Sequence, residues 1–128
     1  MNEKTDLDSF IVKKDGLDEA LLTETAKLFL SRILPDGTIE YNLKFQKFNA
    51  ARKILAELIA KKIKSVKKVA GINSEEVSLK ELMNKKNNLG ASEESIKKSF
   101  NRELKGITQK GEQGYFIPNY NLHLLNIS

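Results

Sequence analysis

Several reactive groups are missing, or nearly missing, from this chain of 128 residues. It has no cysteine, which excludes disulfides, thiolate metal sites and a cysteine nucleophile. Its single histidine, His123, stands in an apolar tail with no carboxylate nearby in sequence, so we expect an ordinary surface residue. No spacing of Asp and Glu indicates a metal cage. We therefore expect a protein that is not an enzyme and uses no cofactor or metal.

Long hydrophobic runs are absent as well. No stretch approaches the roughly 18 apolar residues that a membrane span needs, and the amino terminus lacks the apolar core of a signal peptide. These absences, with the lack of cysteine, lead us to expect a cytoplasmic protein without membrane association. The length suffices for a hydrophobic core without disulfides, and one compact unit is the default.

What the chain does have is a lopsided charge. Residues 1–40 hold 5 Lys/Arg and 9 Asp/Glu, a net of −4, whereas residues 41–128 hold 17 basic and 8 acidic residues, a net of +9. A positive field of this kind is typical of proteins that displace counterions from phosphates. Because Lys outnumbers Arg by 19 to 3, codon bias is an alternative source of the charge.

The first 45 residues predict an arm, a helix and a possible strand. Residues 1–14 are mostly polar apart from Phe10-Ile11-Val12, which we expect to form a loosely held arm. Apolar spacings of three and four predict a helix over 17–34, with Asp15 as its cap and Pro35 as its stop. A turn then follows. Residues 38–45 alternate apolar and polar, which predicts a strand, although a helix starting at Thr38 is the competing interpretation.

The longest predicted helix covers residues 46–70 and ends at Gly71. Its broad apolar stripe includes Ile54, Leu58 and Ile63, and we expect Lys53 and Glu57 on its opposite, polar face. Five of the eight residues 61–68 are lysines. This run is either a solvated face or a ridge that contacts phosphates. The lysines we assign to the ridge are Lys61, Lys64 and Lys68.

The stretch from Val77 to Pro118 is the most informative part of the sequence. Ser78 caps a predicted helix over 79–86, and Ser92 caps a second one in which Ile96, Phe100 and Leu104 recur at a spacing of four. We expect the second helix to end at Gly106. Residues 107–110 and 115–117 then predict two strands, joined by a loop with glycines at both ends.

This order of helix, turn, helix and hairpin resembles the winged helix-turn-helix superfamily. The resemblance implies an α+β fold, mainly α with a small β-hairpin, in which residues 46–128 form the winged domain and residues 1–45 extend it. It also implies that the second helix enters the DNA major groove and that the hairpin, or wing, touches the backbone or minor groove. The alternative is an ordinary helix-helix-hairpin unit without a nucleic-acid role.

If Ile96, Phe100 and Leu104 are buried, the outward face of the second helix carries six polar residues: Ser95, Lys97, Lys98, Asn101, Arg102 and Lys105. Asn and Arg make bidentate hydrogen bonds to base edges, whereas Lys mostly binds phosphates, so Asn101 and Arg102 are our candidates for base reading. Lys110 and Gln113 on the wing are further candidates for backbone or minor-groove contact. Glu93 and Glu94 oppose this interpretation, because they place negative charge at the start of the same helix.

The sequence thus predicts a DNA-binding protein, such as a small transcriptional regulator, with double-stranded DNA as its partner. The alternative is a winged-helix adaptor that binds a protein or structured RNA. The tail after Pro118 alternates again, with Tyr120, Leu122 and Leu124 on one side, and predicts a third strand or a free edge. We expect a homodimer, formed through the long helix or through this edge.

Overall fold

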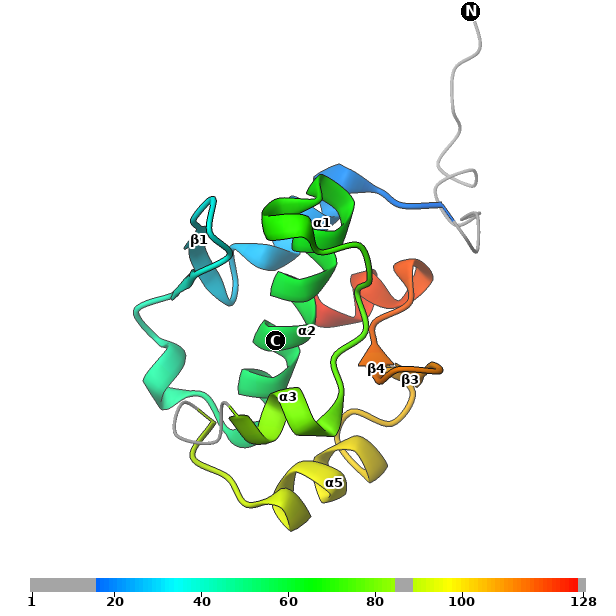
Figure 1. The fold of residues 1–128 in the computed structure, drawn as a ribbon. Coiled ribbons are helices and arrows are strands. Elements are labelled where there is room, and N and C mark those ends of the chain that lie inside the picture. Colours follow the sequence, from blue (N-terminus) through cyan, green and yellow to red (C-terminus); the bar gives the residue numbers. More distant parts are fainter. Residues whose placement is uncertain (1–15, 85–88, 127–128) are drawn as a thin grey trace, which may run out of the picture.

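The computed structural model describes residues 16–84 and 89–126 (Figure 1). A long central helix, α2 (Ala50–Lys67), runs the length of the molecule. The other elements, in chain order, are α1 (Glu19–Ala26), β1 (Leu30–Ile33), β2 (Ile39–Tyr41), η2 (Phe45–Lys47), η3 (Val69–Gly71), α3 (Leu79–Asn84), α5 (Glu93–Asn101), β3 (Gln109–Lys110), β4 (Tyr115–Phe116) and η4 (Asn119–Asn126).

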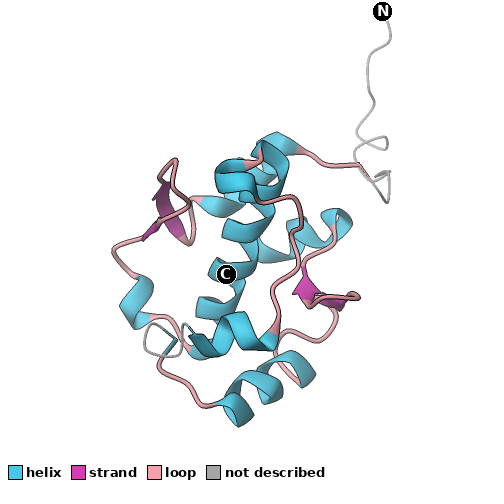
Figure 2. Cartoon of the chain, viewed as in Figure 1, coloured by secondary structure: helices cyan, strands magenta, loops and turns pink. Residues whose placement is uncertain are grey.

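These elements make a mixed fold of helices and two small antiparallel sheets, β1–β2 and β3–β4 (Figure 2). The elements α1 and β1–β2 lie toward the carboxyl-terminal end of α2, and α3 and α5 lie toward its other end (Figure 1). Among the described residues, no helix is long and apolar enough to cross a membrane. The predicted arm with Phe10-Ile11-Val12 lies outside the described residues. The predicted cap at Asp15 was wrong, because the Asp18 side chain accepts a hydrogen bond from the Leu21 N–H and caps α1.

The central helix has the predicted apolar stripe but is shorter than predicted at both ends. Ile54, Leu58 and Ile59 are at most 1% exposed, which confirms the stripe. The helix begins only at Ala50, because the Asn49 side chain accepts a hydrogen bond from the Arg52 N–H and caps it. It ends at a left-handed Lys68, three residues before the predicted cap at Gly71. The predicted span of 46–70 was therefore too long at both ends.

The polar face of α2 is covered, contrary to the expectation from the sequence. Lys53 and Glu57 are 8% and 3% exposed. The Lys53 ammonium lies 5.4 Å from the centroid of the Phe45 ring, and the Glu57 carboxylate accepts a hydrogen bond from the Tyr41 hydroxyl. Burial, and the neighbouring Glu57 charge, raise the pKa of the Tyr41 phenol. The segment from β2 to η2 thus folds over a face that the sequence pattern assigns to solvent.

The helix predicted over 17–34 begins only at Glu19, and the prediction was wrong beyond Ala26. Its second half is β1, which pairs with β2 across the turn that Pro35 begins, with Leu30 opposite Tyr41 and Ile33 opposite Ile39. The two short strands pair their backbone N–H and C=O groups with each other. If the helix had continued through residue 34, β2 would have had no strand to pair with. The start of the predicted strand over 38–45 is confirmed, but the strand ends at Tyr41. The competing helix from Thr38 was wrong.

The second half of the chain follows the prediction more closely. Ser78 and Ser92 cap α3 and α5 through hydrogen bonds from the backbone N–H groups of Glu81 and Ser95. The predicted hairpin is present, but each of its strands, β3 and β4, has only two residues. The second helix ends at Asn101, not at Gly106, and residues 102–104 form turns. The end predicted for the first helix, Lys86, lies outside the described residues.

The carboxyl-terminal tail is not a strand. Residues 119–126 form η4, which packs on α1 and buries Leu122 and Leu125. Its Asn121 side chain also donates a hydrogen bond to the backbone carbonyl of Ile107 at 2.9 Å. Both surfaces proposed for a homodimer, the apolar stripe of α2 and this edge, are therefore used within the molecule. A homodimer stays a prediction without an assigned surface.

One buried ion pair connects three distant segments. Lys62 in α2 is only 2% exposed, and its ammonium donates to the Glu75 carboxylate at 2.6 Å and to the carbonyl of Ile117 at 2.8 Å. This contact fixes the linker before α3, and the segment that follows β4, against the central helix. Such a charge is costly to bury unless its partners stay in place.

We expect Lys62→Ala to lower the free energy of unfolding by about 1–3 kcal/mol, because the buried Ile117 carbonyl loses its donor, whereas the Glu75 carboxylate is 31% exposed and stays hydrated. Lys67 in the same helix pairs with Glu19 at 2.9 Å but is 62% exposed, so Lys67→Ala serves as the control. It should cost at most about 1 kcal/mol. Urea denaturation followed by circular dichroism measures both, and equal losses would contradict a structural role for Lys62.

Candidate nucleic-acid interface

The candidate site is built on α5, which is amphipathic. Ile96, Ser99 and Phe100 are buried, and the helix packs on α2. The Phe100 ring also stacks on Tyr115 of β4, with ring centroids 3.8 Å apart, and so fixes the hairpin beside the helix. The position of α5 is therefore set by contacts on one side only, and its other side is open to solvent.

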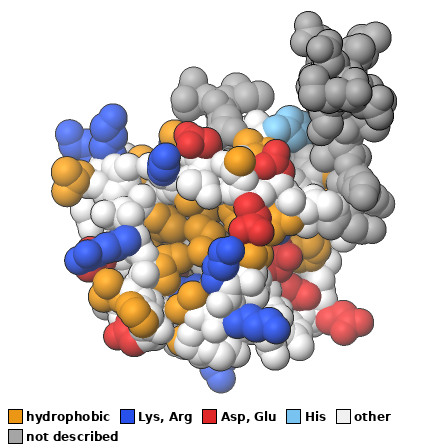
Figure 3. Space-filling model, turned by 90° about the horizontal axis from the view of Figure 1, so that it is seen from above, with side chains coloured by type: hydrophobic (Ala, Val, Ile, Leu, Met, Phe, Trp, Pro, Cys, Tyr) orange, Lys and Arg blue, Asp and Glu red, His pale blue; other side chains and the backbone are white. Residues whose placement is uncertain are grey.

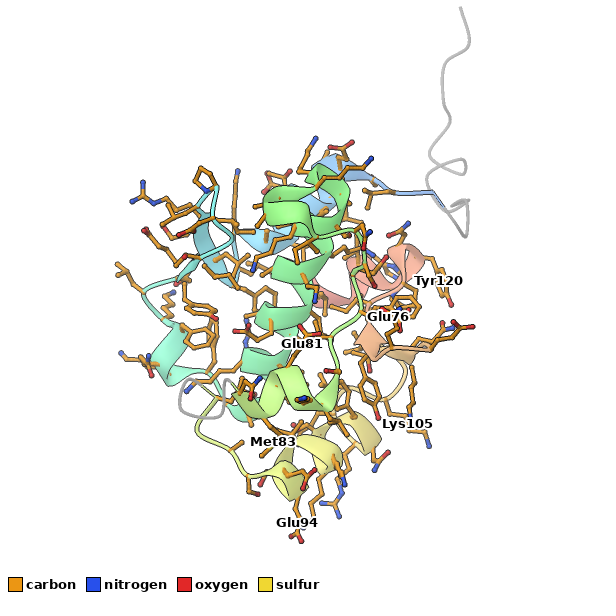
Figure 4. The ribbon with its side chains drawn as sticks, viewed as in Figure 1. Glu76, Glu81, Met83, Glu94, Lys105 and Tyr120 are labelled. Atoms are coloured by element: carbon orange, nitrogen blue, oxygen red, sulfur yellow. The ribbon has the colours of Figure 1, made fainter. Side chains whose placement is uncertain are left out.

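All six polar residues predicted for the outward face are exposed: Ser95, Lys97, Lys98 and Asn101 lie on α5, whereas Arg102 and Lys105 follow its end and are not on the helix as predicted. The predicted wing residues Lys110 and Gln113 are exposed too. Lys97 has a distant ionic contact with Glu93, at 3.9 Å. Lys105 projects outward between α5 and the hairpin in Figure 4. The structure thus brings the α5 and wing candidates onto neighbouring surfaces.

The loop of the wing is held by a carboxylate that the sequence analysis did not single out. One Glu76 oxygen accepts hydrogen bonds from the backbone N–H groups of Gln113, at 2.7 Å, and Gly114, at 2.9 Å (Figure 4). A Cβ at Gly111 would overlap this carboxylate, and one at Gly114 would overlap the backbone of Val77. Gly114 is therefore required for the close approach of two backbone segments, whereas a side chain at position 111 would displace the Glu76 carboxylate. A lone Glu in a linker carries no sequence signal for such a role.

Val77 adds a third backbone segment to the wing. Its N–H and C=O both bond to Tyr115, at 2.8 Å each, as an antiparallel bridge beside β4. The residues before α3 therefore pair with the last strand of the hairpin. This arrangement holds the wing in a fixed position relative to both α3 and α5.

The predicted lysine ridge does not join this site. Lys61 is 17% exposed and pairs with Glu81 of α3 at 2.8 Å, so it connects two helices. Lys64 is only partly exposed, and Lys68 is exposed at the carboxyl-terminal end of α2, whereas α5 lies at the other end (Figure 1). The structure does not bring these three lysines together with the α5 face.

Most of the net positive charge of residues 41–128 lies before residue 72 and not in the part of the chain that contains α5. Residues 41–71 hold 9 basic residues and 1 acidic residue, whereas residues 72–128 hold 8 and 7, a net of only +1. Much of the positive charge thus lies on and before α2, where Lys61, Lys62 and Lys67 are in ion pairs. The surface of α5 and the wing carries separate lysines among carboxylates instead of a broad basic patch.

Glu94 belongs to the exposed face and was missed as a member of it. It precedes Lys98 by four residues and Asn101 by seven, so the three side chains lie in one row opposite Ile96. Figure 4 shows Glu94 pointing away from the body of the molecule. The spacing that predicted Ile96 and Phe100 to be buried also places Glu94 on the outward face, so the sequence did carry this signal.

We expect Glu76→Ala to release the loop of the wing, because the N–H groups of Gln113 and Gly114 lose their acceptor. Glu76→Gln is the matched control, since its side-chain oxygen still accepts both bonds. Amide hydrogen exchange should be faster at Gln113 and Gly114 in the alanine variant, with a cost of about 1–3 kcal/mol in stability. Unchanged exchange would contradict the clamp.

Among the described residues, no group of three or more His, Asp and Glu is placed to hold a metal ion. Comparisons of the chain with models of known protein families, with curated proteins and with solved structures found no match.

Proposed function

We propose that this chain binds double-stranded DNA, with α5 in the major groove and the β3–β4 loop against the sugar-phosphate backbone. The observation that carries the proposal is the exposed polar face of α5, whose opposite side packs on α2. A single helix with one fixed side and one polar, open side has the size and shape that the major groove admits.

The order of the elements supports the same proposal. Along the chain come the helix α2, the bridge at Val77, the helices α3 and α5, and the hairpin, with Val77 paired to β4. This order resembles a winged helix-turn-helix domain, in which a short first strand pairs with the wing. Function does not follow from a fold alone, so the side chains of the exposed face must carry the argument.

Their chemistry assigns them separate tasks. Asn101 and Arg102 suit adenine and guanine edges, and Lys97, Lys98, Lys105 and Lys110 suit phosphates. Glu94 in the same row accepts hydrogen bonds, and the N4 amino group of cytosine is the usual partner of a carboxylate in the major groove. We expect a site of this composition to bind DNA with moderate affinity, and we expect that affinity to depend strongly on the base sequence.

Salt dependence and base reading test the proposal together. Four phosphate contacts predict a slope of about −4 for the logarithm of the binding constant against the logarithm of the salt concentration. Fluorescence anisotropy with a random duplex measures this slope, and selection from a duplex library supplies a preferred site. No binding at low salt would contradict the proposal and favour a protein partner or structured RNA for the same face.

On the selected site, we expect Arg102→Ala to cost about 1–3 kcal/mol of binding free energy, because a bidentate contact with a base is lost. The loss should be smaller on a scrambled duplex. Lys27→Ala removes one exposed charge from α1, at the other end of α2, and serves as the control. Equal effects of the two variants would contradict base reading by Arg102.

Glu94→Gln should have the opposite effect on random DNA. Removing a carboxylate that faces the phosphates relieves a repulsion of about 1 kcal/mol, or about fivefold in affinity. Discrimination against the wrong base should fall at the same time, if Glu94 reads cytosine. Glu24→Gln on α1 makes the same charge change away from the site, and its affinity should stay near that of the natural chain. A Glu94→Gln variant without any gain on random DNA would show that α5 does not face the duplex.

A further inference from the structure

A cavity of about 410 Å³ lies far from the α5 face, between α1, β1 and the carboxyl-terminal part of α2. Its wall is mostly aliphatic and comes from all three elements: Leu22, Ala26, Leu30, Ile33, Ile63 and Val66. Figure 3 looks onto this end of the molecule and shows hydrophobic side chains gathered at the centre of the face, with charged side chains around them. Cavities of this size and composition commonly bind small molecules.

The charged residues at the cavity favour one sign of ligand. Lys27, Arg32 and Lys67 line it together with a single carboxylate, Glu19. Each cation pairs with a carboxylate, at 3.2, 2.7 and 2.9 Å respectively, but their side chains are 62–67% exposed. The Arg32–Glu40 pair is bidentate and stays closed, whereas the pairs of Lys27 and Lys67 rest on single exposed contacts and are weak. An anionic group of a ligand therefore competes for these two lysines.

We propose that this cavity binds a small amphipathic anion, with an apolar chain or ring against the aliphatic wall and a carboxylate at the cationic rim. The aliphatic wall supplies the affinity by removing apolar surface from water. Lys27 and Lys67 select the sign of the head group. A water molecule occupies about 30 Å³ in the liquid, so the space equals roughly a dozen waters. A medium-length fatty acid therefore suits the cavity.

The test is a titration of the full chain with decanoate, followed by proton–nitrogen NMR. We expect saturable shifts at the amides of Leu22, Leu30 and Val66, and nuclear Overhauser contacts from the decanoate chain to the methyl groups of Ile63. Shifts without saturation, or spread over the whole molecule, would overturn the proposal. So would contacts from Ile63 to the Phe10 ring in place of decanoate, because the chain itself would then fill the cavity.

Two pairs of measurements separate the wall from the rim. Ala26→Phe fills the cavity and should weaken decanoate binding by about tenfold or more, whereas Ala20→Phe, on the exposed side of the same helix, should leave it unchanged. Decyltrimethylammonium has the same chain with a cationic head and should bind much more weakly to the natural protein. Equal binding of the two amphiphiles would overturn the proposal. So would an equal loss of decanoate binding in Ala26→Phe and Ala20→Phe. The contacts to Ile63 in the natural chain decide the matter if Ala26→Phe does not fold.

Discussion

The fold depends on covering α2 on every side. Ten residues of this 18-residue helix are buried, and three of them, Lys53, Glu57 and Lys62, carry ionisable side chains. An ionisable group is stable in such a place only with partners, and no single neighbour supplies them all. The β2–η2 segment covers Lys53 and Glu57, while the linker before α3 and the end of the hairpin satisfy Lys62. Both halves of the chain are therefore needed around one helix.

This constraint also determines which charges are left for a ligand. α2 holds five lysines, yet several of them connect elements of the fold. Lys61 joins α2 to α3, Lys62 joins it to the linker and the hairpin, and Lys67 joins it to α1. The cations of α5 and the wing do not tie α2 to its neighbours, and they remain on the surface. The net charge of a chain is thus a poor guide to the location of a binding site when a central helix carries most of it.

The parts of the fold that the sequence predicted have local causes. Ser78 and Ser92 accept hydrogen bonds within their own helices, and Ile96 and Phe100 mark the buried side of α5 by spacing alone. The failures have distant causes. Leu30 and Ile33 suit a helix and a strand equally, and the partner strand β2 decides between them. The tail alternates like a strand, yet α1 offers it an apolar surface and no strand edge.

The candidate site also has parts that the sequence predicted and parts that it did not. Exposure of Lys98 and Asn101 followed from the helical period, because α5 has one buried side, whereas Arg102 is exposed at the cap beyond the helix. The roles of Glu76 and Lys61 did not, since their partners lie 37 or 38 residues and 20 residues away in the sequence. Contacts over such separations carry no periodicity. The base-reading roles of Asn101 and Arg102 remain predictions that rest on their chemistry and their exposure.

The most direct measurement of the central claim is an NMR titration of the isotope-labelled chain with a short random duplex at low salt. The account predicts shifts at the amides of α5 and of residues 109–116, with little change in α1 and in the β1–β2 hairpin at the other end of α2. Shifts confined to α1, to β1–β2 or to the end of α2 would contradict the account. The absence of any shift would contradict DNA binding altogether.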